Sequence, residues 1–162
     1  MRNNFLVAFA VGLAVIAIVI GGIFFMQRGD VMQLPGAILK VRTAPLDENS
    51  SIAVLDFRIA NPSDIIFEVR TVTVELVGAD GKSYQGQVSS DGDAARLFEA
   101  IPLLGQKFNK TLVTRERIFA HANADRMVAA RFQAPVTLLD GRRKFILHIE
   151  EVDGKLIDYS ER

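Results

Sequence analysis

The sequence contains no cysteine and no tryptophan, and it has no excess of charge of either sign. The absence of cysteine excludes a disulfide framework, a thiol nucleophile and any zinc or iron–sulfur site built on cysteine. The 19 basic and 19 acidic residues balance. This balance argues against nucleic acid as a partner, because nucleic-acid-binding proteins carry a basic surplus on one face. A chain of 162 residues is long enough for one ordinary domain and an appendage.

Charge is also absent from one long segment near the N-terminus. The 22 residues 5–26, FLVAFAVGLAVIAIVIGGIFFM, contain no charged side chain, and Arg2 is the only charged residue before position 28. As an α-helix, this segment would be about 33 Å long, compared with about 30 Å for the hydrocarbon core of a bilayer. The sequence therefore predicts a single transmembrane anchor over residues 1–28, a linker over 29–35 and a folded domain over 36–162.

A cleaved signal peptide is the alternative interpretation of the apolar segment. The apolar region of a signal peptide usually has about 7–15 residues and is followed by a small-x-small cleavage site. Here the run is longer, and the residues after it are Gln27-Arg28-Gly29-Asp30. These features favour an uncleaved anchor.

The orientation of the anchor is not decided by its flanking charges. Arg2 and the α-amino group precede it, whereas Arg28, Lys40 and Arg42 come after it, so the positive-inside rule does not favour export of the domain. A four-residue tail before a long apolar run is, however, the usual layout of a signal anchor that exports its C-terminal domain. We expect a cytoplasmic N-terminus and an extracytoplasmic, periplasmic domain.

Small residues recur along the predicted anchor. Ala10, Ala14, Ala17 and Gly21 would occupy a stripe about 60° wide on one face of a helix. One interpretation is that alanine and glycine are simply common in membrane helices. The other is close packing against a partner helix or a second copy of the chain, because small residues let helices approach each other in lipid.

The rest of the chain has the pattern of β-strands. Residues 51–60 alternate, with Ala53, Leu55 and Phe57 on one face and Asp56 on the other, as in a half-buried strand. Within residues 65–77 the apolar parity changes near Arg70-Thr71, which predicts a β-bulge. Further candidate strands cover residues 36–43, 83–88, 111–119, 127–133, 145–152 and 155–159.

One segment breaks this pattern. Residues 93–99 predict a short helix, with Asp91 or Asp93 as the N-cap and Pro102 preventing its extension. Seven to eight short strands, one short inserted helix and no alternation of strands with helices indicate an immunoglobulin-like antiparallel β-sandwich.

The order of several motifs resembles a known family. Residues 57–63 (FRIANPS), 72–76 (VTVEL), 79–84 (ADGKSY) and 132–135 (FQAP) are similar to motifs of membrane-anchored bacterial immunoglobulin-like, or telokin-like, extracytoplasmic domains of unknown function. The Asn-Pro element is more weakly similar to the water-stress domain of desiccation-related proteins. The resemblance covers about residues 50–152 and implies a binding or assembly role. It brings no catalytic residues, and the short helix departs from the family pattern.

The sequence offers little for catalysis or metal binding. His121 lies in a predicted polar loop and His148 on the outward face of a predicted strand, and neither has nearby residues that would complete a ligand set. The segment Asp91-Gly92-Asp93 lacks the remaining ligands of a calcium loop. We expect no enzyme activity, no metal and no cofactor.

The segment from Leu97 to Gly105 is more apolar than a surface connection requires. Its large apolar side chains have two interpretations, a plug over an open end of the sandwich or an exposed patch for docking another protein. The candidate docking residues are Leu97, Phe98, Ile101, Leu103 and Leu104.

Together these features predict a non-enzymatic accessory or scaffolding subunit anchored in a membrane. Its expected partners are other membrane or envelope proteins, or a second copy of itself. The alternative is an extracytoplasmic module that binds a peptide, glycan or lipid.

Overall fold

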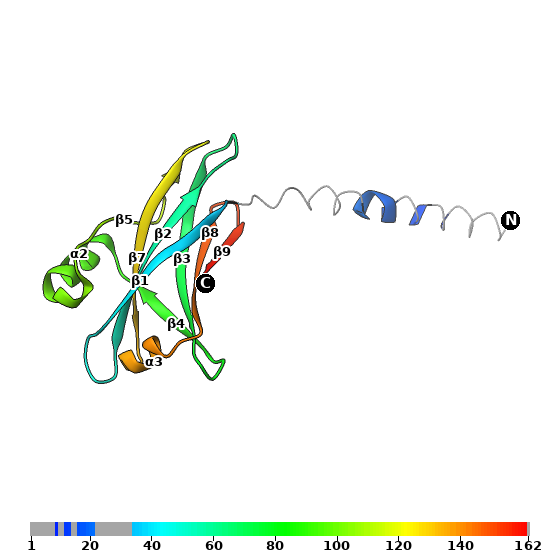
Figure 1. Cartoon of the computed structure of the whole chain (residues 1–162). Helices are drawn as coiled ribbons and strands as arrows, with labels where there is room; N and C mark the ends of the chain where they lie inside the picture. Colours follow the sequence, from blue (N-terminus) through cyan, green and yellow to red (C-terminus); the bar gives the residue numbers. More distant parts are fainter. Residues whose placement is uncertain (1–8, 10–11, 14–15, 22–33, 162) are drawn as a thin grey trace. The chain divides into compact units, whose positions relative to one another are not determined.

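The computed structural model describes residues 9, 12–13, 16–21 and 34–161 (Figure 1). The chain divides into two compact units, Met1–Met32 and Gln33–Arg162. In the first unit the described residues are helical and exposed, including Ala17 and Gly21, whereas Ala10 and Ala14 lie outside the described residues. Within the described ranges, no helix is long and apolar enough to cross a membrane. Most of the predicted anchor lies outside these ranges, so the anchor stays a prediction.

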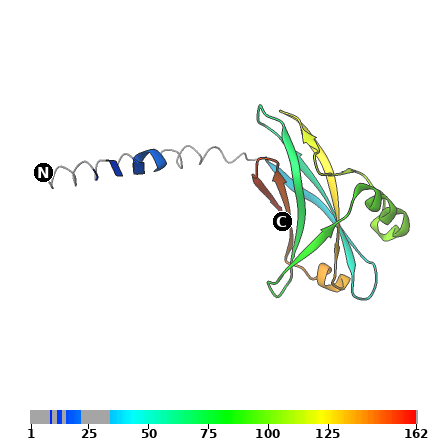
Figure 2. The same cartoon turned by 180° about the vertical axis from the view of Figure 1, so that it is seen from behind.

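The second unit is an all-β sandwich in two layers (Figure 1, Figure 2). Its strands in the described residues are β1 (Gly36–Pro45), β2 (Ser51–Ala60), β3 (Phe67–Val77), β4 (Ser83–Val88), β5 (Lys110–Thr111), β6 (Arg117–Ile118), β7 (Asn123–Phe132), β8 (Lys144–Glu151) and β9 (Leu156–Ser160). Strands β1, β2 and β7 form one layer, and β3, β8 and β9 form the other. Strand β4 joins the layers, because its first four residues pair with β3 and its last two residues pair with β7.

The described residues form nine strands, which is more than the seven to eight that the sequence predicted. The predicted strand 111–119 is split into β5, which pairs in parallel with β7, and β6, which pairs with β3. Arg115, between them, has a φ of 65°, a left-handed conformation that interrupts an extended strand. The predicted bulge is confirmed by a shift in the β3–β8 register between Val69 and Thr71.

Phenylalanine fills the interior between the layers. Phe57, Phe67, Phe132 and Phe145 are fully buried, and the rings of Phe132 and Phe145 lie 5.7 Å apart. Tilted rings at this distance are a favourable aromatic arrangement. The phenylalanines thus supply the large core side chains in a domain without tryptophan.

Strand β2 is buried on both faces, which the sequence did not predict. Asp56 was expected on the outward face, yet it is 4% exposed, and Ile52 and Val54 on the same face are at most 1% exposed. The reason is that α2 (Asp91–Ala100) and the 3-10 helix η1 (Pro102–Leu104) cover this face of the sheet. The N-cap of α2 is Ser90, whose hydroxyl accepts a hydrogen bond from the N–H of Asp93, and not either predicted aspartate.

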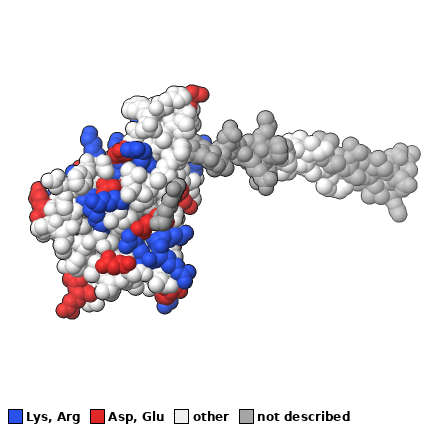
Figure 3. Space-filling view, in the orientation of Figure 1, with Lys and Arg blue, Asp and Glu red and all other residues white. Residues whose placement is uncertain are grey.

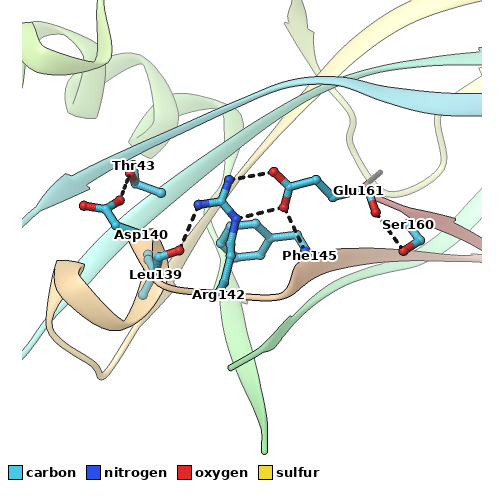
Figure 4. Close-up of polar contacts among 7 residues, drawn as sticks. All are labelled: Thr43, Leu139, Asp140, Arg142, Phe145, Ser160 and Glu161. Atoms are coloured by element: carbon cyan, nitrogen blue, oxygen red, sulfur yellow. Dashed lines mark hydrogen bonds and ion pairs between the residues drawn. The ribbon is translucent and has the colours of Figure 1, made fainter. Parts of the chain in front are cut away.

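The free edges of the two layers are β1 and β9, and polar contacts close the gap between them. Figure 4 shows Arg142 donating two hydrogen bonds to Glu161, at 2.8 and 2.6 Å. Although burial raises the pKa of Glu161, these bonds and one from the Phe145 N–H lower it below its usual value. Nearby, Thr43 of β1 donates to Asp140 at the end of the short helix α3 (Val136–Asp140).

Candidate functional site

A helical cover lies on the outer face of the β1–β2–β7 layer (Figure 1). We define the cover as residues 91–109, which comprise α2, η1 and the segment 105–109. Beneath it is a second apolar cluster, separate from the core between the layers. Its buried members are Ala44, Ile52, Val54, Ala94, Leu104, Met127 and Ala129. The cover is therefore part of the folded domain and not a loose insertion.

The structure places the five candidate docking residues in three environments. Leu104 is fully buried in the cluster. Leu97, Phe98 and Ile101 are partly buried and pack against it. Leu103 is 77% exposed. The cover thus seals the outer face of a sheet, and not an open end of the sandwich as one of the two interpretations of the sequence proposed. Only Leu103 of the five projects fully away from the domain.

A buried ion pair fixes the cover to the sheet. Arg42 of β1 and Asp56 of β2 are 2.7 Å apart, and their side chains are 9% and 6% exposed. The second carboxylate oxygen of Asp56 accepts a hydrogen bond of 2.9 Å from the side-chain amide of Asn109. Arg42 also donates to the backbone carbonyls of Leu104 and Gln106, at 2.6 and 2.8 Å. Two strands and the second half of the cover are therefore joined through one ion pair.

Two phenylalanine rings flank the same guanidinium group. The Arg42 Cζ atom lies 5.0 Å from the ring centre of Phe98 and 5.7 Å from that of Phe108. Both distances allow a cation–π attraction, which is stronger where water is excluded. Phe108 nevertheless remains 66% exposed. Its ring is held in place on one side and open to solvent on the other.

A groove of about 590 Å³ lies beside the cover, between α2 and the β1–β2 turn. Its apolar surface includes Leu46, Ile52, Val88 and Leu97. Two acidic and two basic residues surround this surface, namely Asp47, Asp93, Arg96 and Arg131. Because the charges balance, the groove has no electrostatic preference for an anion or a cation.

The two histidines lie on different elements and do not converge. His148 on β8 contacts two carboxylates, Asp158 of β9 at 2.6 Å and Glu75 of β3 at 3.2 Å. His121 contacts Asp64 at 2.9 Å in an exposed loop. No group of three or more metal-ligating side chains with suitable geometry occurs in the part of the chain that the structure describes.

The contacts of His148 give the sandwich a pH-dependent link between three strands. Burial alone would lower the pKa of His148, but hydrogen bonds to Asp158 and Glu75 raise it above its usual value. Protonated His148 donates to both carboxylates. Its contribution to stability is therefore present below about pH 6.5, the usual histidine pKa, and is lost as the pH rises through the raised value.

We expect the melting temperature of the full chain in detergent to fall as the pH rises above about 6.5. His148→Gln should remove most of this dependence, because glutamine does not titrate. Equal pH profiles for the wild-type chain and His148→Gln would contradict the role assigned to this histidine.

Comparison with known proteins adds little to this description. No family model matches the chain, and no curated protein matches it. One solved structure is similar, an uncharacterized β-sandwich protein from Clostridium difficile 630 with 16% sequence identity. The match covers 80% of this chain and 76% of that one, with a TM-score of 0.37. The assignment of a sandwich therefore rests on the strand pairing of this chain itself.

Proposed function

We propose that this chain is a non-enzymatic, membrane-anchored accessory subunit that binds another protein of a larger membrane or envelope complex. The observation that carries the proposal is the exposure of two large apolar side chains, Leu103 and Phe108, on a cover that is otherwise fixed to the sheet. Exposed apolar side chains that lie together on an ordered surface are typical of protein-binding sites.

The rigidity of the cover favours binding. Leu103 precedes Leu104, which is buried. The ring of Phe108 contacts Arg42, and the next residue, Asn109, is hydrogen-bonded to Asp56. Neither apolar side chain needs a large backbone rearrangement to meet a partner. A preorganised surface loses less conformational entropy on association.

The proposed anchor, residues 1–28, would hold this surface near the membrane in the extracytoplasmic space. Tethering raises the effective concentration of the domain toward other membrane proteins, so weak contacts suffice. The small residues Ala10, Ala14, Ala17 and Gly21 would add lateral packing against a partner helix or a second copy.

The strand order supports an immunoglobulin-like arrangement within the sandwich. Strands β1, β2 and β7 are arranged as strands A, B and E of an immunoglobulin domain, and β3, β8 and β9 as strands C, F and G. Domains of this architecture serve many functions, so the order supports the fold assignment and not the choice of partner.

A second candidate function is binding of a peptide, glycan or lipid by the groove beside α2. Its volume of about 590 Å³ is within the range of small-molecule sites, and its surface combines apolar and charged side chains. Arg96→Glu would change this groove without altering Leu103 or Phe108. The variant therefore separates groove binding from docking on the cover.

The test is co-purification of partners with the tagged full chain after gentle detergent extraction. We expect Leu103→Glu to reduce partner recovery at least about tenfold, because a buried unpaired charge at an interface costs several kcal/mol. Leu39→Glu, a change at an exposed leucine of β1 outside residues 91–109, is the matched control and should retain the partner. Equal recovery from Leu103→Glu and the wild-type chain would contradict docking on the cover.

A further inference from the structure

A second group of exposed apolar side chains gathers at one end of the sandwich. Ile65 and Ile66 precede β3, Phe119 comes directly after β6, and Val152 and Leu156 flank the β8–β9 turn. Each is between 46% and 68% exposed. We call these five residues the proximal patch, because the chain also enters the domain at this end.

Hydrogen bonds bring the three loops and the start of the domain together. The Ala60 N–H donates to the carbonyl of Pro35, so the first residues of the domain lie beside the end of β2. The Asn61 side chain donates to the carbonyls of Ile65 and Ile118, which joins the β2–β3 loop to β6. The Val152 N–H donates to the carbonyl of Glu68.

Charges of both signs surround the proximal patch, including Asp153 and Lys155 in the β8–β9 turn, and several of them form ion pairs. Arg117 contacts Glu68 at 2.9 Å, and His121 contacts Asp64 at the same distance. Arg70 contacts Glu150 at 3.3 Å. Figure 3 shows the projecting upper end of the domain as largely uncharged, in contrast to the mixed charges below it. A surface of this kind suits an apolar partner more than a strongly charged one.

The length of the chain between the apolar run and the domain limits which end of the sandwich can lie near the membrane. Seven residues, 27–33, separate the apolar run from Leu34, and fully extended they reach about 25 Å. Strand β2, with ten residues, is about 33 Å long, which exceeds this reach. If residues 5–26 span a bilayer, the proximal end is the end held near its surface.

We propose that the proximal patch inserts into the interface of the lipid bilayer that holds the anchor. Isoleucine, leucine and phenylalanine side chains on loops would enter the boundary between headgroups and acyl chains, as the apolar face of an interfacial helix does. Because the surrounding charges are of both signs, the contact does not require anionic lipid. It would hold the domain upright and leave the cover accessible to a partner protein. This inference rests on the anchor in the proposed function.

Because the chain contains no cysteine, a single introduced cysteine can be labelled at a chosen site. The full chain carrying Phe119→Cys is labelled with an environment-sensitive fluorophore and reconstituted into phosphatidylcholine vesicles that contain spin-labelled lipid. We expect blue-shifted emission and loss of most of the fluorescence by contact with the spin label. Leu103→Cys and Lys82→Cys, on the cover and on the β3–β4 turn, are the matched controls and should be quenched little.

Two results would overturn the inference. One is quenching at position 119 no greater than at position 103. The other is quenching at position 119 only when anionic lipid is added, since charge and not the apolar patch would then cause the contact. Extraction of the same vesicles with alkaline carbonate tests the anchor separately. A chain that stays with the vesicles but is unquenched at position 119 refutes the inference alone, and a chain that is extracted refutes the anchor.

Discussion

Asp56→Ala should lower the free energy of unfolding by about 3–5 kcal/mol, because it leaves the guanidinium of Arg42 buried without its carboxylate partner. Arg42 is at the centre of the contacts that fix the cover, so the loss should also loosen residues 91–109. Urea unfolding of the full chain in detergent measures the first effect. Faster amide hydrogen exchange across α2 and η1 measures the second.

The control for Asp56→Ala is Asp125→Ala, which removes the carboxylate of another strand-to-strand ion pair. Asp125 and Arg58 are 2.6 Å apart, but both side chains are well exposed to solvent. Exposed pairs contribute little because water screens them and because the side chains lose entropy. Similar losses of stability for the two variants would show that the Arg42–Asp56 pair is not buried as described.

Replacing Leu104 with alanine should lower the free energy of unfolding by about 2–5 kcal/mol, the range found for leucine in a packed core. The side chain is fully buried beneath the cover, among the residues of the outer-face cluster. Leu103→Ala, one residue earlier, should change stability by less than about 0.5 kcal/mol because Leu103 is exposed. Chemical unfolding of the two variants in parallel makes the comparison.

These neighbouring leucines separate structural and binding roles within one segment. Leu104→Ala should destabilise the cover, whereas Leu103→Ala should preserve the fold and weaken partner binding. A loss of stability for Leu103→Ala equal to that for Leu104→Ala would contradict the placement of the two side chains, and would remove the structural basis for docking on the cover.

Much of the sandwich can be predicted from local patterns in the sequence. The alternation in residues 51–60 and 145–152 corresponds to β2 and β8, and the change of parity at Arg70-Thr71 corresponds to the register shift in β3. Alternation depends only on the two-residue period of a strand and the burial of one face, so it is readable without knowledge of the partners.

The cover was less predictable because it depends on contacts between distant residues. Ile52 and Val54 share a face with Asp56, and this apolar pair beside an aspartate was a sign that the outer face is covered. The partners of Asp56 are 14 and 53 positions away, at Arg42 and Asn109. Periodicity marked the opposite face of β2 as the buried one, and it does not indicate which segment folds over the face of Ile52, Val54 and Asp56.

The proximal patch was missed for a similar reason. Ile65, Phe119 and Leu156 lie in different turns, where a single exposed apolar residue has no particular meaning. Strand order brings these turns to the same end of the sandwich, beside the start of the domain. The patch is thus a consequence of topology.

The most direct test of the central proposal is native electrophoresis of the tagged full chain after gentle detergent extraction from its own membranes, with mass spectrometry of the migrating species. We expect an assembly larger than the chain alone, with a protein partner present in stoichiometric amount. Migration as a lone monomer, under conditions in which the sandwich remains folded, would contradict the assignment of an accessory subunit.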